Sequence, residues 1–377
     1  MGTRAEIIKM SPLYFALKEL GANPVIWHVG QHEELAWPFY DFFKISPELH
    51  LPLSRKKQTL GHLSALIMDK LDNALKTSDV SCMVVQGDTS SAFMSALAAF
   101  YYKIPVAHVE AGLRTFHEYD PFPEEKNREL ISRLARWHFV PTEQARKNLE
   151  VEGVPTSAIH LVGNTIVDAT LWGIEHLESN AQPFSDHDDF PLKQYEEHCK
   201  SRRLIVVTAH RRENWDSGIE DIASSVRATI EKYDDVFIVW PVHPNPLIIK
   251  AILKTINSMH EQDKNRILLT EPLTYPVMLH LLRDAWIIMT DSGGIQEEAI
   301  TLGVPVLVLR ETTERQEVIT AGCGAVVGVD IDNILQWLDK LTNNIDIYDA
   351  MRNCSNPYGD GQAAKRIAET LLKNLSS

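Results

Sequence analysis

Cysteine is scarce in this 377-residue sequence, and so are the features that mark secreted or membrane proteins. The four cysteines (Cys82, Cys199, Cys323 and Cys354) are scattered and form no CxxC pair. This pattern predicts reduced thiols in a cytoplasmic protein, with neither a disulfide framework nor a zinc site. No apolar run reaches the ~18 residues of a membrane span, and the N-terminus lacks a signal-peptide pattern.

Basic residues are fewer than acidic residues: the sequence has 37 Lys and Arg against 51 Asp and Glu, which gives a formal net charge of −14. Such a balance argues against a nucleic-acid backbone or an anionic membrane as the main partner. It still permits an anionic substrate in a cleft lined by Arg and His. The composition, 44% hydrophobic and 23% charged, is that of a soluble globular protein, and the length suggests about two domains.

Several catalytic motifs are absent. The sequence has no GxSxG elbow, no HExxH, no P-loop and no complete GxGxxG fingerprint followed by an acid about 20 residues later. Nucleophilic, zinc and hydride chemistry are therefore disfavoured. Proton transfer by carboxylates on a phosphate-bearing substrate remains.

Short apolar runs, mostly separated by amphipathic helical stretches, extend through the chain and predict parallel α/β layers. The pattern breaks in the polar stretch between about residues 170 and 203. We therefore expect an N-terminal domain (1–170), a C-terminal domain (171–361) and a last helix (362–377) that could pack back on the N-terminal domain. The predicted strands are 25–29, 80–86, 105–109, 137–140, 204–209, 236–241, 266–270, 286–290 and 305–309.

The chain opens on a glycine-containing turn, GTRAE, which leads into a helical pattern over residues 6–20. A phosphate-binding turn normally follows a strand, and no residues remain here to form one. We expect a late start, in which a central strand of the N-terminal sheet is missing and the stability of that domain is poor.

Two acidic residues end consecutive predicted strands. Asp88 follows the run 80–86 and Glu110 follows the run 105–109, with a helical pattern over residues 90–102 between them. A right-handed crossover makes the two strands parallel, so both acids are expected at the carboxyl edge, where open α/β sheets bind ligands. A third acid, Glu124, lies in PFPEEKNREL. Asp88 could instead cap the following helix, and Glu124 could simply occupy a favoured first helical turn.

The second half contains the clearest phosphate signal, TDSGGIQEEAITLGVP. A strand, a tight turn and a helix (295–302) are predicted, and glycines at a helix N-terminus suit a phosphate. Ser292, Gly293 and Gly294 form this turn, which could also be a simple strand–helix connection. Glu298 could reach ribose hydroxyls or face solvent. The loop ETTERQE adds Arg315.

Basic and imidazole side chains occur at other predicted strand ends and at the first turn. His210 ends the strand 204–209 and is followed by Arg211, and His243 ends the next strand. His beside Arg suits a diphosphate, although a single His at a strand end is often structural. Arg4 and Lys9 flank the start of the first helical pattern.

In these motifs the chain resembles the non-hydrolysing UDP-N-acetylglucosamine 2-epimerases along nearly its whole length. The family fold implied is two Rossmann-like domains that face each other across a cleft, the glycosyltransferase-B architecture, without a metal or a nicotinamide cofactor. The matching segments are GTRAEIIKM, GQH, QGDTSS, HVEAGLRTF, PFPEEKNRE, VGNTIVDA, HRREN, PVHPNP, EPLTY, TDSGGIQEEA, LRETTERQE and NPYGDGQA.

The resemblance implies inversion at C2 of UDP-GlcNAc to give UDP-ManNAc, by elimination of UDP to 2-acetamidoglucal and re-addition. Asp88, Glu110 and Glu124 would be the acid and base residues, and His210 would stabilise the departing diphosphate. The family also implies a homodimer that supplies surface polysaccharide synthesis. The substrate-binding residues implied are Arg4, Lys9, Met278, Ser292, Gly293, Gly294, Glu298 and Arg315.

Some positions depart from the family pattern. Ala5 replaces the usual proline of GTRPE, and Met278 stands where phenylalanine near the uracil is common. Bacterial members bind a second, activating UDP-GlcNAc. Glu34 replaces the usual glutamine there and Lys57 an arginine, so we expect activation to be weakened or altered. The other positions that correspond to this allosteric site are Gln31, Arg211 and His243.

Three alternatives share much of this pattern. A hydrolysing epimerase would release UDP and free ManNAc, but its relatives diverge in EAGLRT and PEExNR, which are intact here. A glycosyltransferase of the same architecture would not need three clustered acids. A catalytically inactive nucleotide-sugar sensor is disfavoured by the retained acids, although the late start favours it.

Overall fold

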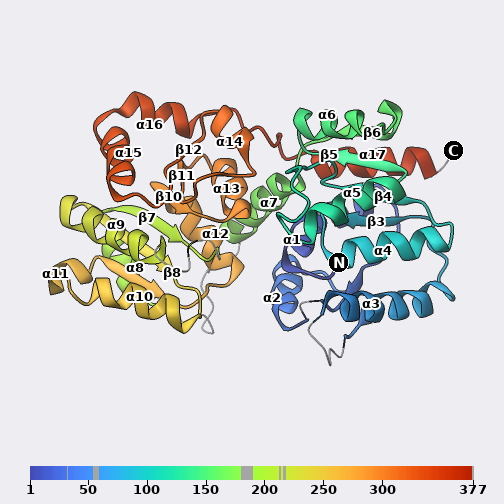
Figure 1. The fold of residues 1–377 in the computed structure, drawn as a ribbon, viewed down its shortest axis with the longest axis horizontal. Helices are drawn as coiled ribbons and strands as arrows, with labels where there is room; N and C mark the ends of the chain where they lie inside the picture. The colour runs from blue at the N-terminus through green and yellow to red at the C-terminus, as the bar shows by residue number, and fades with distance from the viewer. Residues whose placement is uncertain (32, 54–58, 180–189, 212–213, 215–217, 376–377) are drawn as a thin grey trace. The chain divides into compact units, whose positions relative to one another are not determined.

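The computed structural model describes residues 1–31, 33–53, 59–179, 190–211, 214 and 218–375. The chain divides into two compact units, which are described separately (Figure 1). Unit 1 consists of Met1–Trp172 and Tyr358–Ser377, and unit 2 consists of Gly173–Pro357. All strand pairs in both units are parallel, which confirms the predicted α/β class. Among the described residues, no helix is both long enough and apolar enough to span a membrane.

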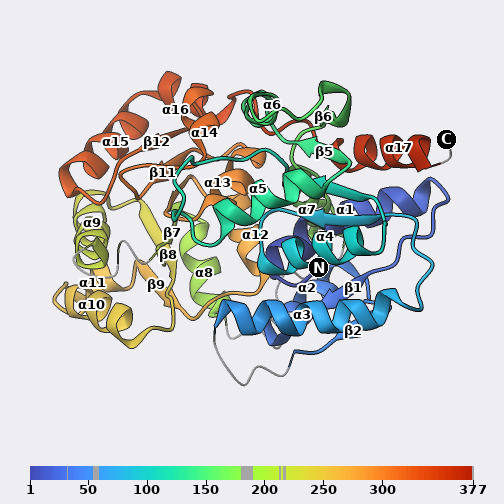
Figure 2. The same cartoon turned by 45° about the vertical axis from the view of Figure 1, so that its right-hand side comes forward.

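The strands of unit 1 form two separate sheets. A two-stranded sheet has the order β1-β2, and a four-stranded sheet has the order β3-β4-β5-β6. Figure 2 shows β1 and β2 beside helix α3, and apolar side chains of all three share one cluster. The strands are β1 (Trp27–Val29), β2 (Leu49–Leu51), β3 (Met83–Gln86), β4 (Val106–Val109), β5 (Trp137–Val140) and β6 (Ile159–Leu161).

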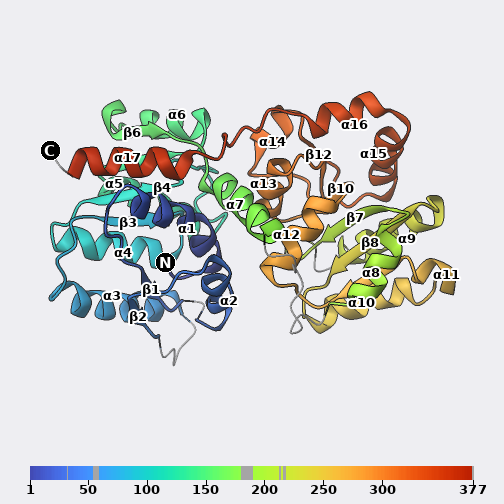
Figure 3. The ribbon, with the colours of Figure 1, turned by 180° about the vertical axis from the view of Figure 1, so that it is seen from behind.

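Helices cover both faces of the unit 1 sheet. Along β4, Val106 packs with helices α4 and α5, whereas Ala107 packs with α1 and α17, since successive side chains of a strand point to opposite faces. Figure 3 shows α17 beside α1. The helices are α1 (Arg4–Glu19), α2 (Glu33–Phe43), α3 (Leu60–Leu75), α4 (Ser90–Tyr101), α5 (Glu124–Leu134), α6 (Glu143–Val151) and α17 (Ala363–Leu375), and α7 (Thr165–Ser179) begins in this unit.

The last helix belongs to unit 1 although it follows unit 2 in the chain. Asp168 of α7 accepts hydrogen bonds from the backbone nitrogens of Ala363 (3.3 Å) and Ala364 (2.9 Å), which satisfies orphan donors at the start of α17. Ile367 and Leu371 then bury their side chains in the cluster shared with α1. The carboxylate and this apolar face together hold α17 in unit 1.

Unit 2 contains an unbroken six-stranded sheet. Its order, β12-β11-β10-β7-β8-β9, is the 3-2-1-4-5-6 order of a doubly wound nucleotide-binding sheet, with the reversal between β7 and β10. The strands are β7 (Arg203–Thr208), β8 (Val236–Pro241), β9 (Ile267–Thr270), β10 (Ile287–Thr290), β11 (Val306–Val308) and β12 (Gly324–Val326).

The core of unit 2 is built from helices that pack on this sheet. Ile222 and Val226 of α9 and Leu338 of α15 pack with Ile205 and Ile238 of the strands. The helices are α8 (Leu192–Cys199), α9 (Gly218–Lys232), α10 (Pro246–Ile256), α11 (Glu261–Lys264), α12 (Tyr275–Asp284), α13 (Gly293–Thr301), α14 (Gln316–Thr320), α15 (Ile331–Asn343) and α16 (Ile345–Arg352).

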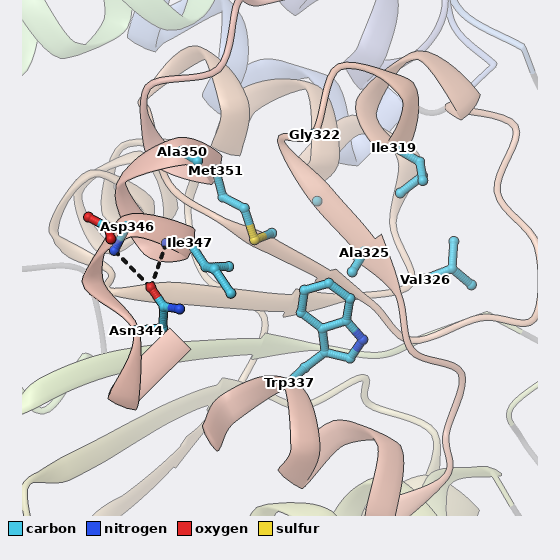
Figure 4. A pocket seen from close by; sticks show the side chains of 11 residues that line it. Ile319, Gly322, Ala325, Val326, Trp337, Asn344, Asp346, Ile347, Ala350 and Met351 are labelled. Atoms are coloured by element: carbon cyan, nitrogen blue, oxygen red, sulfur yellow. Dashed lines mark hydrogen bonds between the residues drawn. The ribbon is translucent and has the colours of Figure 1, made fainter. Parts of the chain in front are cut away.

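An apolar hollow of about 660 Å³ lies at the edge strand β12 of unit 2 (Figure 4). Trp337 of α15 and Ile347 and Met351 of α16 line it, and the Asn344 side chain accepts hydrogen bonds from the backbone of Asp346 and Ile347. The hollow contains none of the candidate site residues.

The expected redox state was wrong for two cysteines. Cys323 and Cys354 form a disulfide, with their Cα atoms 5.4 Å apart and a sequence separation of 31. Cys323 directly precedes β12, and Cys354 follows Asn353, the residue after α16, so the fold brings together two residues that no local spacing pattern relates. Cys82 and Cys199 are free thiols.

The sheet of unit 1 is interrupted between β1 and β3. No strand precedes the GTRAE turn among the described residues, and α1 begins at Arg4. The backbone of Met1 nevertheless pairs with β1: its ammonium nitrogen donates to Trp27 O (2.8 Å), and its carbonyl accepts from Val29 N (2.8 Å).

Candidate active site

The first turn of the chain is tied to the turn after β3 by a buried acid. The carboxylate of Glu6 accepts hydrogen bonds from Gly2 N (2.9 Å), Thr3 Oγ1 (3.0 Å) and Thr89 Oγ1 (2.7 Å). Gly2 has no room for a side chain, because a Cβ there would lie 2.1 Å from Ser91 Oγ. The turn that carries exposed Arg4 is thereby fixed beside the turn that carries Asp88.

Asp88 does not cap helix α4, although the sequence allowed that explanation. The cap is Thr89, whose side chain accepts from Ala92 N (3.0 Å). The Asp88 carboxylate instead lies 2.7 Å from the Arg128 guanidinium, and Asn127 donates to the Asp88 carbonyl oxygen (2.8 Å). About a quarter of the Asp88 side chain stays exposed (26%), so a ligand can reach it.

Glu110 adopts an unusual backbone conformation at the end of β4. Its φ is +61°, in the left-handed region that non-glycine residues rarely occupy outside turns and functional sites. Its carboxylate pairs with the ammonium group of Lys9, and both side chains are only 8% exposed. Lys9, expected to bind substrate, therefore contacts a candidate catalytic acid.

Two adjacent acids at the start of helix α5 differ in burial. Glu125 is fully buried and accepts hydrogen bonds from the backbone nitrogens of Thr115 (3.0 Å) and Phe116 (2.9 Å). Glu124 is the first residue of α5 and is partly exposed, as a first-turn acid would be. Glu125 thus stabilises the preceding loop, while Glu124 is open to a ligand.

The topology brings the candidate acids of unit 1 to one edge of the sheet. β3 and β4 pair in parallel, and Gly87 N donates to Val109 O (3.0 Å), so Asp88 and Glu110 follow adjacent ends of the ladder. Helix α5 contacts Asp88 through Asn127 and Arg128, one turn after Glu124. The sheet edge therefore brings together Asp88 with Arg128 and Glu110 with Lys9, and Glu124 begins the helix that supplies Arg128.

In unit 2, His210 and Asp291 lie at the switch point of the sheet. Asp291 is fully buried, and its Oδ2 accepts hydrogen bonds from His210 N (2.9 Å), Arg211 N (2.8 Å) and Asn214 Nδ2 (3.0 Å). Its Oδ1 lies 3.3 Å from His210 Nδ1, and the His210 side chain is 47% exposed. Asp291 thus orients an accessible imidazole.

The ionisation of Asp291 reflects two opposed effects. Burial raises the pKa of this carboxyl, but the hydrogen bonds from His210 and from the backbone of Arg211 favour the charged form and leave its pKa below the ordinary value. A buried carboxylate next to an imidazole fixes the orientation of the ring.

The Ser292-Gly293-Gly294 turn starts helix α13, as the sequence predicted. Ser292 is the N-cap residue, and the Arg315 guanidinium lies close to Gly293, where a Cβ would be 3.6 Å from it. Arg315 is held by a hydrogen bond from its Nε to Glu297 Oε1 (2.6 Å), and Glu297 is buried. Free helix amides beside a fixed guanidinium suit a phosphate group.

The remaining candidate residues of unit 2 differ in how deeply they are buried. Glu298 is buried on α13 rather than solvated, and Met278 is half-buried on α12. The His243 ring accepts a hydrogen bond from Asn245 N (3.2 Å), and Arg211 is half-buried after β7.

The proposed second ligand site is described only in part. In unit 1, Gln31 accepts hydrogen bonds from Ser91 N (3.0 Å) and Ser91 Oγ (2.6 Å), so its amide contributes to the start of α4. Lys57 and the side chain of Glu34 lie outside the described residues.

The residues that position the candidates were not predicted from the sequence. Glu6, Arg128, Asp291 and Glu297 each bind a candidate residue, or the turn that carries one, and all are buried. A buried charge needs a partner. Glu6 and Glu297 are acids within helices that are otherwise largely apolar, and this pattern could have indicated that they are buried and paired. Among the described residues, no group of three or more His, Cys, Asp or Glu side chains could hold a metal ion.

Comparison with known proteins gives a consistent result along the whole chain. A family model described as UDP-N-acetylglucosamine 2-epimerase matches residues 16–372. The UDP-N-acetylglucosamine 2-epimerase of Neisseria meningitidis serogroup A is 40% identical over 374 residues, which cover 99% of this chain and 98% of the relative. The enzyme of that name from Escherichia coli K12 is 39% identical over 386 residues, with 100% and 98% covered.

The fold is similar to solved structures with the same name. A crystal structure of UDP-GlcNAc 2-epimerase from Neisseria meningitidis bound to UDP-GlcNAc gives a TM-score of 0.87 at 39% identity, covering 99% of this chain and 98% of that one. A Methanocaldococcus jannaschii complex with UDP-GlcNAc and UDP gives 0.78 at 33% identity, with 99% and 98% covered.

Proposed function

Because this chain belongs to the UDP-N-acetylglucosamine 2-epimerase family, we propose that it interconverts UDP-GlcNAc and UDP-ManNAc by epimerisation at C2. The observation that carries the proposal is the pairing of β3 with β4, which puts Asp88 and Glu110 at one sheet edge. Single acids have structural explanations, but a strained Glu110 paired with Lys9 does not serve a cap or a helix turn.

The chemistry requires proton transfer on both faces of one carbon. A base removes the proton from C2 while UDP leaves C1, which forms the C1–C2 double bond of 2-acetamidoglucal. Re-addition of UDP to C1 and of a proton to the other face of C2 gives the epimer. Asp88, Glu110 and Glu124 are the proposed acid and base residues, and their individual roles stay open. Different partners, Arg128 and Lys9, give two of these carboxylates different environments.

The UDP moiety is assigned to the switch point of unit 2. Gly293 and Gly294 offer helix amides to phosphate, Ser292 offers its hydroxyl, and Arg315 adds a guanidinium. Glu298 is proposed for the ribose and Met278 for the uracil. His210, oriented by Asp291, is proposed to stabilise charge on the departing diphosphate. Arg4 of unit 1 is proposed to contact the phosphate or the sugar.

The wider setting is proposed from the family. We expect a homodimer that acts in the cytoplasm and a product that supplies surface polysaccharide synthesis. The Cys323–Cys354 disulfide removes the cysteine-based argument for the cytoplasm, so this location depends on the family resemblance.

Incubation with UDP-GlcNAc in D₂O, followed by NMR, tests the activity. Deuterium at C2 together with UDP-ManNAc is expected. Free ManNAc with UDP would favour a hydrolysing epimerase, and UDP release that rises with added acceptors, without exchange at C2, would favour a glycosyltransferase. An unchanged C2 proton with no product at all, despite UDP-GlcNAc binding, is the result of a nucleotide-sugar sensor and would contradict the proposal.

Weakened activation by a second UDP-GlcNAc is proposed from Glu34 and Lys57. An acid in place of an amide repels phosphate, and Lys lacks the bidentate fork of Arg. Initial rates are expected to rise hyperbolically with UDP-GlcNAc in the natural protein. The double variant Glu34→Gln, Lys57→Arg should make the curve more sigmoidal. A strongly sigmoidal curve in the unaltered protein, with a tight second binding isotherm, would contradict this proposal.

A further inference from the structure

The Cys323–Cys354 disulfide joins two segments of unit 2 that both lead to the proposed phosphate site. Cys323 lies shortly after α14, whose N-cap residue is Arg315, and Cys354 lies in the segment that follows α16 and leads out of unit 2. Cys323 is only 1% exposed, whereas Cys354 is half-buried. The bond therefore connects the surroundings of Arg315 with a part of the chain that is distant in sequence.

One branch of contacts leads from Cys323 back to Arg315. The amide of Cys323 donates to the carbonyl oxygen of Val318 (3.0 Å), and the amide of Val318 donates to the carbonyl oxygen of Arg315 (3.0 Å). Helix α14 between them has five residues, too few to form a stable helix without anchors. Its position therefore depends on what holds its two ends, Arg315 and Cys323.

The other branch leads from Cys354 to Arg315 through α13. Asn356 Nδ2 donates to Thr301 Oγ1 (3.1 Å), and this hydroxyl donates to the carbonyl oxygen of Glu297 (2.8 Å). The Glu297 carboxylate in turn accepts from Arg315 Nε (2.6 Å). The disulfide therefore closes a ring of contacts that contains both Arg315 and the helix that begins at the glycine turn.

Apolar packing between the two joined segments is incomplete. Gly322 and Gly324, on either side of Cys323, and Ala350 and Met351 of α16 all line the hollow of about 660 Å³ at β12 (Figure 4). Open space at an interface removes the van der Waals contacts that would otherwise hold the two sides together. The covalent bond is thus a main connection between the turn after α14 and the end of α16.

We propose that the Cys323–Cys354 disulfide holds the Arg315 guanidinium at the glycine turn of α13, and that a dithiol reductant weakens UDP binding by opening this bond. The inference deepens the proposed function, because it concerns regulation of the same UDP site, and it rests on that assignment.

The redox step is a thiol–disulfide exchange. A thiolate of the dithiol forms a bond to Sγ of Cys354, the less buried partner, while the bond between Cys354 and Cys323 breaks and Cys323 leaves as a thiolate. The second sulfur of the dithiol then attacks the first and releases Cys354. The dithiol is oxidised to its own disulfide, and its two protons end on Cys323 and Cys354, so the protein gains two electrons and two protons.

Isothermal titration with UDP compares the oxidised protein with the same protein after treatment with dithiothreitol. Reduction is expected to weaken UDP binding about three- to tenfold, because the hydrogen bond between Arg315 and Glu297 remains and only the covalent part of the ring is lost. Reoxidation should restore the affinity. Alkylation followed by mass spectrometry counts the thiols, and circular dichroism at the titration temperature shows whether the protein stays folded.

Three variants test whether the effect comes from this disulfide and acts through Arg315. The double variant Cys323→Ala, Cys354→Ala should bind UDP as weakly as the reduced protein, with or without dithiothreitol. The matched control Cys82→Ala, Cys199→Ala removes the free thiols and should respond as the natural protein does. In Arg315→Ala, reduction should change the affinity by less than about twofold, because two changes that act through one contact are not additive.

Four outcomes would overturn the proposal. They are equal UDP affinity of the oxidised and the fully reduced protein, a disulfide that survives excess dithiothreitol in the folded protein, unfolding on reduction at the titration temperature, and an undiminished effect of reduction in Arg315→Ala. Absence of UDP binding by the oxidised protein would contradict the UDP site itself, and this inference with it. Epimerisation is not measured here, so the D₂O experiment tests the proposed activity separately.

Discussion

The two units of the chain follow the same order of helices and strands but differ at one position. Unit 2 has an unbroken sheet of the order β12-β11-β10-β7-β8-β9, whereas the sheet of unit 1 is interrupted between β1 and β3, at the place equivalent to β7. Both units still put their candidate residues at the carboxyl ends of the same strands. The positions of the candidate residues are therefore set by the strands that flank the switch point.

Equivalent acids in the two units have different surroundings. Asp88 follows β3, is 26% exposed and pairs with Arg128. Asp291 follows the equivalent strand β10, is fully buried and holds the backbone and ring of His210. The exposed acid can meet a substrate, and the buried one positions another residue. Burial, rather than position in the fold, separates the two roles.

The largest effect is expected from the carboxylates of unit 1. Asp88→Asn, Glu110→Gln and Glu124→Gln should each lower the epimerisation rate by about 10²–10⁴-fold while UDP affinity changes little. Steady-state rates and UDP titrations measure the two quantities. Glu129→Gln, on the exposed face of the same helix α5, is the matched control and should keep the normal rate. Near-normal turnover in any one of the three variants would remove that acid from the catalytic set.

Acid should unfold unit 1 before unit 2. His28, His108 and His138 are buried in unit 1, and burial lowers their pKa values to about 4, 3 and 4. Their contribution to stability is complete above about pH 6.5 and is lost as pH falls toward 4, because the unfolded chain binds these protons first. Asp168 opposes this loss of stability. Burial raises its pKa to about 6, so its contribution to the stability of unit 1 grows as pH falls below 6.

Hydrogen exchange at pH 7 and pH 4.5 separates the two units in this experiment. The free energy of unfolding of unit 1 is expected to fall by several kcal/mol between these two pH values, since a tenfold change in a proton-binding constant corresponds to about 1.4 kcal/mol. Equal loss of protection in the amides of both units would contradict the prediction.

Removing the disulfide should affect unit 2 alone. The Cys323→Ala, Cys354→Ala double variant is expected to lower the free energy of unfolding by about 3–4 kcal/mol, the loop-closure value for a 31-residue separation. Denaturant unfolding followed by exchange at β12 and α16 measures it. Cys82→Ala and Cys199→Ala, which each remove a free thiol, serve as the control pair. In the double variant that lacks the disulfide, the exchange protection of unit 1 should not change.

The smallest effect is expected at the UDP site of unit 2. Arg315→Ala removes one charge-assisted contact and should weaken UDP binding by about tenfold. Isothermal titration gives the affinity, and Arg227→Ala, which breaks an exposed pair with Glu231, is the control. A rate loss with unchanged UDP affinity would move Arg315 from binding into catalysis.

Much of the fold was predictable because strands and helices leave a local pattern. All nine predicted runs contain strands, among them β3, β4 and β10 at the site. The strands β2, β6 and β12, each three residues long, were not predicted, whereas the equally short β1 and β11 were, because a longer apolar run extends beyond each of them. The helix after Asp88 and the turn at Ser292 were also correct, because capping and glycine signals are local.

The candidate site also combines local and long-range features. The placement of Asp88, Glu110 and His210 at strand ends was predictable because the apolar runs that precede them are visible in the sequence, and parallel strands bring their ends together. Their partners were not, since Arg128, Lys9 and Asp291 reach them across distances that only packing creates. The Cys323–Cys354 pair was likewise invisible, and the sequence favoured free thiols.

The sequence by itself determined the order of elements, the family and the acids at strand ends, because period, glycine turns and motif series are written along the chain. Tertiary structure alone decided which acid is open to a ligand and which is buried, which cysteines meet, and that β1 and β3 leave a space between them. These properties depend on neighbours that are distant in sequence, and burial by such neighbours sets both charge and accessibility.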